Sequence, residues 1–266
     1  MSSLTDVSTP QREGDQFRLD VPAGWRQGRG AYGGYTDAAL IRAIEQTVGD
    51  HAREVRSVTA ELPAPVEVGT AEVRVEILRT GNKLSAARAW LVQHGETRAH
   101  AVAILAATRP GAGPLGWRDL APPHAPAWKQ VPPFDMATNV PWPEFAHHFE
   151  YRLVEGLPIA NGAPARTVGW VRPKLPCTVR DAGYIASLID VWWPAAFTKF
   201  PPSRPCATIA FTLDLVQNLD GLDPDAPLLY RGTVPVCADG YFLETRELWG
   251  EDGRLVAINH QTFAVI

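Results

Sequence analysis

Three polar residues in the second half of the sequence, Asp190, Thr208 and Gln261, are of the types needed to hold and activate a water molecule. A carboxylate can take a proton from water as a general base. A threonine hydroxyl and a glutamine amide both donate and accept hydrogen bonds, so each can orient that water. Each residue also has an ordinary structural interpretation, as a capping carboxylate, a strand residue and a partner for backbone groups at a sheet edge. The set points to chemistry only if the fold brings its members together.

The segment over residues 178–197 is predicted to be a helix that carries Asp190. Thr178 can cap this helix, since Asp181 follows three residues later in the spacing of a capping box. Pro194 closes or kinks the helix near its other end. Nearly every position between these residues is apolar, which predicts a buried helix.

A narrow polar stripe interrupts this apolar helix. Gly183, Ser187 and Asp190 are spaced so that they share one face of the helix. A buried ionised carboxylate is costly unless it is paired or hydrogen-bonded. Asp190 therefore needs partners from elsewhere in the chain.

Strand periodicity predicts a polar face on each of two later strands. In the strand over 206–216 that face carries Thr208, Ala210, Thr212 and Asp214. In the last strand it carries Ala257, Asn259 and Gln261. Small neighbours on both faces leave room beside an Asp on a buried helix. Four nearby residues remain alternatives for the chemistry: Thr212, Asp214, Asn259 and His260.

The composition is that of an ordinary globular protein, with 45% apolar and 20% charged residues among 266. A net charge of −4 without any run of Lys or Arg argues against nucleic acid as a partner. The polar residues 1–15 contain no hydrophobic segment of the signal-peptide type, and no apolar run approaches the length of a membrane span, so we expect no membrane partner. Three widely spaced cysteines argue against a disulfide framework, so we expect a reducing, cytoplasmic location. Neither phosphate-loop motifs nor metal-ligand spacings occur, so we expect no cofactor and no metal.

Two similar series of elements follow one another along the chain. The first is a short strand at 17–24, a helix that starts at Gly33-Gly34, and strand segments at 70–80, 83–95 and 97–108. The second surrounds the 178–197 helix with strand segments at 145–156, 165–173, 206–218, 226–238, 240–253 and 254–266. An offset of 158 residues places Gly253 on Gly95 and Arg246 on Arg88, which favours an internal duplication.

We therefore expect an N-terminal repeat over residues 1–108 and a C-terminal repeat over 144–266. Between them, residues 109–143 contain nine prolines and little periodicity, so they are predicted to form an irregular linker along the surface. The polar residues 1–15 are predicted to be loosely ordered.

Four segments resemble the TesB-like (type II) acyl-CoA thioesterases of the double-hotdog superfamily: AYGGYTDAALIRA, IASLIDVWWPAAF, CATIAFTLDL and GRLVAINHQTF. The resemblance covers roughly residues 17–266. It implies an α+β double hotdog, in which two repeats each wrap a curved antiparallel sheet around a long central helix. It also implies a homo-oligomer, which we expect to be a dimer.

The resemblance implies hydrolysis of acyl-CoA to the free acid and CoA. Members of the family hold the attacking water with an Asp, a Thr or Ser, and a Gln, which fall on Asp190, Thr208 and Gln261. Four further residues are expected to bind substrate, through close backbone approach or as walls of the acyl site: Gly33, Gly34, Trp192 and Trp193. The two tryptophans, with Phe197, would favour short, branched or aromatic acyl groups, although simple core packing explains them equally well.

Two other functions fit the same fold. A hotdog hydratase or dehydratase typically uses an Asp/His pair, and no histidine lies near Asp190 in the sequence. A non-catalytic acyl-thioester-binding protein would not require all three polar residues. A serine-hydrolase thioesterase is disfavoured, because the sequence has no GxSxG motif. Acyl chain length is not determined by the sequence.

Overall fold

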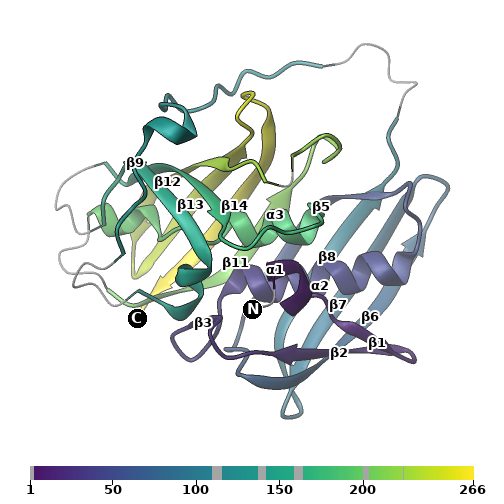
Figure 1. Cartoon of the computed structure of the whole chain (residues 1–266). Helices are drawn as coiled ribbons and strands as arrows, with labels where there is room; N and C mark the ends of the chain where they lie inside the picture. The colour runs from purple at the N-terminus through teal and green to yellow at the C-terminus, as the bar shows by residue number, and fades with distance from the viewer. Residues whose placement is uncertain (1–2, 110–115, 137–141, 159–163, 200–203, 224) are drawn as a thin grey trace.

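A curved antiparallel sheet wraps around two helices in the computed structural model, which describes residues 3–109, 116–136, 142–158, 164–199, 204–223 and 225–266 (Figure 1). From the first half of the chain the sheet takes β1 (Gln11–Glu13), β2 (Gln16–Val21), β5 (Glu54–Glu61), β6 (Gly69–Thr80), β7 (Leu84–Gln93) and β8 (Glu96–Ala106). From the second half it takes β9 (Phe149–Glu155), β10 (Arg166–Pro173), β11 (Cys206–Asp214), β12 (Leu228–Ala238), β13 (Tyr241–Trp249) and β14 (Leu255–Val265). A separate small hairpin joins β3 (Arg26–Gln27) and β4 (Gly30–Ala31).

The two halves meet in the middle of the sheet. Its 12 described strands run in the order β1-β2-β6-β7-β8-β5-β11-β14-β13-β12-β10-β9. The central pair β5 and β11 joins the halves edge to edge and is antiparallel, like the other pairs of this sheet. The predicted α+β class is therefore confirmed.

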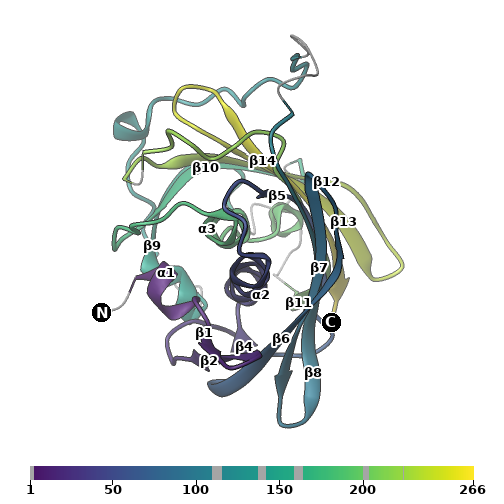
Figure 2. The same ribbon diagram turned by 90° about the vertical axis from the view of Figure 1, so that its right-hand side faces the viewer.

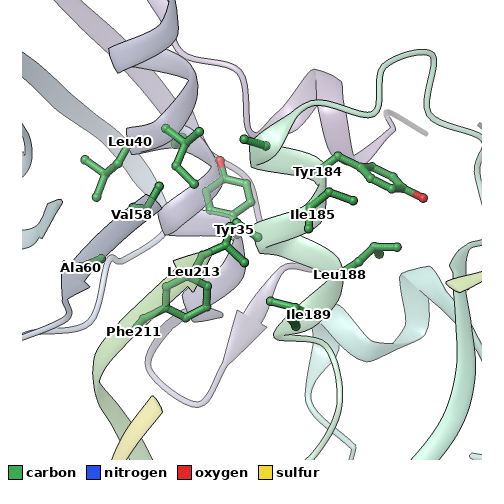
Figure 3. Packing of buried hydrophobic residues seen from close by; sticks show 14 of the residues in the cluster. Tyr35, Leu40, Val58, Ala60, Tyr184, Ile185, Leu188, Ile189, Phe211 and Leu213 are labelled. Atoms are coloured by element: carbon green, nitrogen blue, oxygen red, sulfur yellow. The ribbon is translucent and has the colours of Figure 1, made fainter. Parts of the chain in front are cut away.

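The helices α2 (Gly33–Val48) and α3 (Ala182–Ile189) lie side by side inside the curve of the sheet (Figure 2). Figure 3 shows apolar side chains of both helices facing those of β5 and β11, among them Leu40, Val58 and Phe211, which belong to one core cluster. α2 ends at Gly49, whose φ of 64° suits glycine at a helix C-terminus. None of the helices in the described ranges has both the length and the apolar composition needed to span a bilayer.

The helix predicted over 178–197 is much shorter than expected. α3 covers eight residues, and its N-cap is Asp181, whose side chain accepts a hydrogen bond from the Tyr184 N–H, so the predicted Thr178 cap is wrong. Asp190 is the C-cap of α3, and a separate 3-10 turn, η4 (Ala195–Thr198), follows Pro194. The Asp181 cap sets the start of α3, and the helix ends at Ile189, before Pro194 is reached, so apolar composition overstated its length at both ends.

The expectation of a loosely ordered N-terminus is also wrong. Residues 4–7 form a short helix, α1 (Leu4–Val7), closed by a capping box between Ser3 and Asp6. Leu4 is buried in the main core, and the Val7 carbonyl accepts a hydrogen bond from the Tyr35 hydroxyl on α2. Tertiary contacts thus order a segment that its polar composition predicted to be loosely ordered.

The Pro-rich segment packs on the outer face of the second-half strands where it is described. Trp128, in a short 3-10 turn η2 (Trp128–Gln130), clusters with Val168 and Trp170 of β10. Their neighbour Val171 belongs to the inner core, so the two sets lie on opposite faces of the sheet. A further turn, η3 (Glu144–His148), occupies the start of the strand predicted at 145–156, which begins only at Phe149. Residues 110–115 and 137–141 of the predicted linker lie outside the described residues.

Candidate active site

Asp190 sits where α3 ends, facing the first turn of α2. It is 8% exposed, so its carboxylate must be compensated by protein donors. Oδ2 accepts a hydrogen bond from the Gly34 N–H at 2.7 Å. Oδ1 accepts one from Gln261 Nε2 at 2.8 Å and one from Arg246 Nη1 at 2.9 Å. Asp190 thus has three donors from three different elements.

Gln261, on β14, links Asp190 to Thr208. Its Nε2 donates both to Asp190 and to Asn259 Oδ1, the latter at 3.0 Å. Its Oε1 accepts a hydrogen bond from the Thr208 hydroxyl at 2.9 Å. Asn259 is held in turn by donating its Nδ2 to the Thr212 carbonyl at 2.7 Å. Asp190, Gln261 and Thr208 therefore form one continuous hydrogen-bonded chain, with the Gln261 amide fixed by partners on both sides.

A β-bulge brings Thr208 into this chain. The pairing of β11 with β14 shifts register between Thr208 and Ala210. Phe211 faces the core and lies beside Gln261, so regular alternation would put Thr208 on the outer face with Thr212. The extra residue of the bulge turns Thr208 inward. The prediction that Thr208 and Thr212 share a face is therefore wrong, because periodicity assumes an unbroken ladder.

Gly33 and Gly34 start α2 so close to Asp190 that no side chain fits. A Cβ on Gly33 would lie 2.9 Å from Asp190 Oδ2, and one on Gly34 would lie 2.9 Å from Asp190 Cβ. The Ser187 hydroxyl donates a hydrogen bond to the Gly34 carbonyl at 3.0 Å. The polar stripe of α3 accordingly faces the start of α2, which supplies the partner that the buried carboxylate required.

Arg246 and Glu244, both on β13, complete the surroundings of Asp190 and were missed in the sequence. Arg246 is 1% exposed and also donates its Nε to Glu244 Oε1 at 3.0 Å. Glu244 accepts further hydrogen bonds from the Tyr230 hydroxyl at 3.0 Å and the Ala195 N–H at 3.1 Å. The sequence did contain a signal for two buried charges, since strand alternation puts Glu244 and Arg246 on the same face as apolar neighbours. That face carries Phe242, Glu244, Arg246 and Leu248, all buried.

Burial and pairing act on these charges in opposite directions. Burial raises the pKa of Asp190 above its ordinary value, and Arg246, Gln261 and Gly34 oppose this rise by favouring the ionised form. Burial likewise raises the pKa of Glu244, against the same arginine. Burial opposes the charge of Arg246, but its two acidic neighbours hold its pKa above the ordinary value, so it stays protonated.

A cavity of about 270 Å³ opens beside this network. It is bounded by the hairpin before α2, the segment 62–66 after β5, and the start of β11, and both Gly33 and Thr208 line it. Its remaining wall is mainly apolar or small, with Arg29 extending into solvent at 85% side-chain exposure. The cavity therefore offers an apolar chamber next to the polar chain.

Two other kinds of chemistry find little support in the described part of the chain. No group of three or more His, Cys, Asp or Glu side chains there is arranged to hold a metal ion. Cys206 lines the cavity as a free thiol, but burial raises its pKa to about 12. A thiol of that pKa is almost fully protonated at neutral pH and is a weak nucleophile.

Family models match both halves of the chain. The model of the acyl-CoA thioesterase N-terminal domain matches residues 21–108, and that of the C-terminal domain matches residues 119–265. The chain belongs to the acyl-CoA thioesterase family. The resemblance inferred from four sequence segments is thereby confirmed. A search of curated proteins finds no significant match.

Solved structures share the architecture of this family member over its whole length. A hot dog fold protein from Alicyclobacillus acidocaldarius matches with a TM-score of 0.88 at 23% identity, covering 100% of this chain and 98% of that one. The tesB protein of Mycobacterium avium subs paratuberculosis matches at 0.79 and 19%, covering 99% and 98%. An acyl-CoA thioesterase II from Mycobacterium marinum matches at 0.78 and 18%, with the same coverage. At these identities the likeness shows the fold, and it confirms the double hotdog.

Of the remaining candidate residues of this acyl-CoA thioesterase family member, some contact the network around Asp190 and others lie away from it. Asn259 contacts Gln261, whereas His260, the residue next to it, is exposed. Trp192 stacks on Tyr230 at a centroid distance of 5.3 Å and fills the space that Gly169 leaves open. Trp193 joins an aromatic cluster with Phe134, Trp142 and Tyr151. Both tryptophans follow Asp190 after Val191, and they contact aromatic rings, Gly169 and the Gly156 carbonyl, which accepts a hydrogen bond from Trp193 Nε1 at 3.2 Å.

Proposed function

We propose that this protein hydrolyses the thioester bond of acyl-CoA, giving a free acid and CoA, with Asp190, Gln261 and Thr208 holding the attacking water. The observation that carries the proposal is the continuous hydrogen-bonded chain of these three side chains beside a mainly apolar cavity. Family membership supplies the reaction class. The carboxylate is the general base of the proposal, and the other two groups orient the water.

The hydrogen-bond capacity of the network suits a water at this position. Gln261 uses both Nε2 hydrogens, on Asp190 and Asn259, but Oε1 has a second lone pair beyond the one that Thr208 occupies. Asp190 Oδ2 likewise accepts only the Gly34 N–H among the recorded bonds. A water can therefore donate to these two oxygens and direct its own lone pair at the thioester carbonyl.

The start of α2 is the proposed source of oxyanion stabilisation. N–H groups in the first turn of a helix have no intrahelical acceptor and carry partial positive charge. Gly34 donates its N–H to Asp190, which leaves the Gly33 N–H as the candidate donor to the oxyanion. Without a Cβ, both glycines let the substrate carbonyl approach the backbone closely.

The substrate proposal extends to both ends of acyl-CoA. Arg29 at the mouth of the cavity is suited to the phosphates of CoA, because a guanidinium binds phosphate oxygens in a bidentate manner. Trp192 and Trp193, which follow Asp190, would limit the length of the acyl group. A short, branched or aromatic acyl group is the expected preference.

Turnover of an acyl-CoA series tests the proposal. Purified protein is mixed with acetyl-, butyryl-, hexanoyl-, palmitoyl- and benzoyl-CoA, and released thiol is measured with a chromogenic reagent. A blank with protein alone is needed, since Cys237 is exposed. Asp190→Asn is nearly isosteric and removes the base, so kcat should fall by ~10²–10⁴-fold.

Three results would contradict the proposal. Full turnover by a folded Asp190→Asn protein would exclude the general-base assignment. Hydration of crotonyl-CoA, seen as loss of the enoyl absorbance without thiol release, would indicate a hydratase. Binding of the same thioesters without turnover would indicate an acyl-binding protein.

A further inference from the structure

A cluster of buried charges extends from the candidate site into the second-half sheet. Asp190, Arg246 and Glu244 are at most 8% exposed, and the Tyr230 hydroxyl donates to Glu244 at its far end. Buried ion pairs add little to stability, because desolvation offsets most of their attraction. A buried cluster that ends on the proposed base is therefore better explained by an effect on that base.

Each carboxylate of the cluster is surrounded by three donors. Asp190 accepts from Gly34, Gln261 and Arg246, and Glu244 accepts from Tyr230, the Ala195 N–H and Arg246. Hydrogen bonds of this kind favour the ionised carboxylate. A single guanidinium thus serves two carboxylates, so the cluster has one negative charge in excess whenever both carboxylates are ionised.

Burial favours the uncharged form of the other titratable groups packed around Asp190 and Arg246. Burial raises the pKa of each above its ordinary value, and they come from four elements or their flanks: Asp37 on α2, Tyr32 before α2, Tyr151 on β9, Tyr230 on β12 and Cys206 on β11. The Phe263 ring of β14, 5.4 Å from the guanidinium carbon, adds no charge. Arg246 is therefore the charge that acts directly on Asp190, and Glu244 is connected to Asp190 through the guanidinium that both carboxylates share.

We propose that Arg246 and Glu244 are positioning residues that act on Asp190 in opposite senses. Arg246 orients the carboxylate and favours its ionised form. Glu244 shares the same guanidinium, so Asp190 is only partly neutralised and stays basic enough to take a proton from water. The inference rests on the proposed thioester hydrolysis.

The reaction step balances without another reactant. As the water oxygen bonds to the thioester carbonyl carbon, one water proton moves to Asp190. Collapse of the tetrahedral intermediate breaks the C–S bond, and the leaving thiolate of CoA takes that proton. Asp190 returns to its ionised form, and the products are the acid and CoA thiol.

Opposite changes in the pH profile of kcat/KM test the two roles. Glu244→Gln is nearly isosteric and leaves Arg246 to Asp190 alone, so the acid limb should move to lower pH by about one pH unit, with a lower plateau. Arg246→Met removes the cation, so the acid limb should move to higher pH by a similar amount. Arg246→Lys keeps the charge and should leave the acid limb closer to that of wild type.

A surface ion pair in the first half, whose Arg88 is the repeat counterpart of Arg246, provides controls. Arg88 on β7 donates to Glu76 on β6 at 2.7 and 2.9 Å, and both side chains are more than 40% exposed. Glu76→Gln and Arg88→Met should leave the profile unchanged. Shifts in the same direction for folded Glu244→Gln and Arg246→Met, or no shift in either, would overturn the proposal.

A measurement on the wild-type protein separates this inference from the proposed function. The side-chain carboxyl of Asp190 is followed by NMR in protein labelled with ¹³C-aspartate and assigned by its loss in Asp190→Asn. We expect titration above the ordinary value of about 3.9. Titration below that value would mean that Arg246 is a full counterion, which overturns the inference. Absence of turnover with every acyl-CoA would instead refute the proposed function, and the titration would still decide the role of the cluster.

Discussion

Thr208 and Thr212 are two threonines of one strand that the bulge of β11 places on opposite faces. Thr208 donates to Gln261 inside the site, whereas Thr212 lies in the regular ladder beyond the bulge. Thr→Val is close to isosteric and keeps the β-branched shape that strands favour. The pair therefore allows the same substitution to be made inside and outside the proposed site.

We expect Thr208→Val to lower kcat by roughly tenfold or more, because the missing hydroxyl no longer fixes Gln261 and the water. KM should change little, since the hydroxyl does not hold the acyl chain. Thr212→Val should leave both constants near wild type. Equal effects of the two substitutions in a steady-state thiol-release assay would mean that the bulge does not define the site.

Asp37 is a second buried carboxyl group, and its burial is accommodated in a different way from that of Asp190. It is fully buried on α2, and neither of its carboxylate oxygens has a hydrogen-bond partner within the described part of the chain. Burial, assisted by the nearby Asp190, raises its pKa well above the ordinary value. The folded protein therefore keeps Asp37 protonated at a pH at which the unfolded chain has released that proton.

This difference predicts the sign of a pH effect on stability. The unfolded carboxyl ionises near pH 3.9, so the contribution of Asp37 is lost as pH rises from there toward its folded pKa. Asp37→Asn cannot ionise and should escape that loss. Thermal unfolding followed by circular dichroism should show the Tm of wild type falling relative to Asp37→Asn between pH 5 and pH 8. Parallel curves for the two proteins would contradict the predicted pKa.

The sequence was informative about element type and less so about local departures from regular geometry. The apolar helix, the glycine start of α2 and the strands around them follow from periodicity and turn residues. The bulge at Ile209, the early end of α3 at Ile189 and the ordered N-terminal turn do not. The first two are not visible in any short window of sequence, and the N-terminal turn combines a local capping box between Ser3 and Asp6 with tertiary contacts of Leu4 and Val7.

The same limit applies to the candidate site. Asp190, Thr208 and Gln261 were predicted from side-chain chemistry together with family resemblance, and the structure brings them together. Arg246 was noted only as the counterpart of Arg88 in the repeat. The two arginines occupy matching strands but opposite environments, since one is buried among carboxylates and the other is exposed. The spacing of residues in the sequence does not indicate which of the two arginines is buried.

The contact between α2 and α3 depends on Gly34. A Cβ there would lie 2.8 Å from Tyr32 Cε2, 2.9 Å from Asp190 Cβ and 3.0 Å from the Ala186 carbonyl oxygen. Alanine is otherwise the better helix residue by about 1 kcal/mol. Any loss of stability in Gly34→Ala must therefore come from this contact.

We expect Gly34→Ala to lower both Tm and kcat, because the two helices must separate and the Gly34 N–H must leave Asp190. Gly116→Ala is a suitable control, since a Cβ at that position would meet no atom within 4 Å. Differential scanning calorimetry and the thiol-release assay measure the two effects. A Gly34→Ala protein with raised Tm and unchanged turnover would show that the helices are not held at this distance.

At the scale of the whole molecule, the two halves place different charges at equivalent helix starts. Gly34-Tyr35 at the start of α2 is repeated as Gly183-Tyr184 at the start of α3. The start of α2 faces the Asp190 carboxylate, but the start of α3 faces Arg42, whose Nε would lie 3.0 Å from a Cβ on Gly183. Arg42 also donates two hydrogen bonds to Asp181, at 2.8 and 2.9 Å. The start of α3 is thus occupied by the ion pair of Arg42 with Asp181.

A cavity of about 480 Å³ lies beside the start of α3. It is an alternative or additional place where a substrate molecule could bind. Acidic side chains outnumber basic ones in its wall, with Glu45, Asp50, Glu54, Asp181 and Asp220 against Arg53 and Arg180. Both arginines of this wall already have partners, since Arg53 pairs with Asp50 at 2.7 Å and Arg180 donates to the Ala226 carbonyl, so they are poorly placed to bind the phosphates of CoA. Among the described residues that line it, no counterpart of the chain formed by Asp190, Gln261 and Thr208 is present.

The protein should therefore bind one molecule of a non-hydrolysable thioether analogue of acyl-CoA per chain. Isothermal titration calorimetry measures this ratio directly, and its value per chain does not depend on whether the protein is a dimer, as we expect. Gly33→Leu, which places a side chain against Asp190 Oδ2, should abolish the binding, while Glu45→Gln in the larger cavity should leave it intact. Two equivalent sites per chain, or a single site lost in Glu45→Gln and kept in Gly33→Leu, would show that the cavity at the start of α3 binds the substrate.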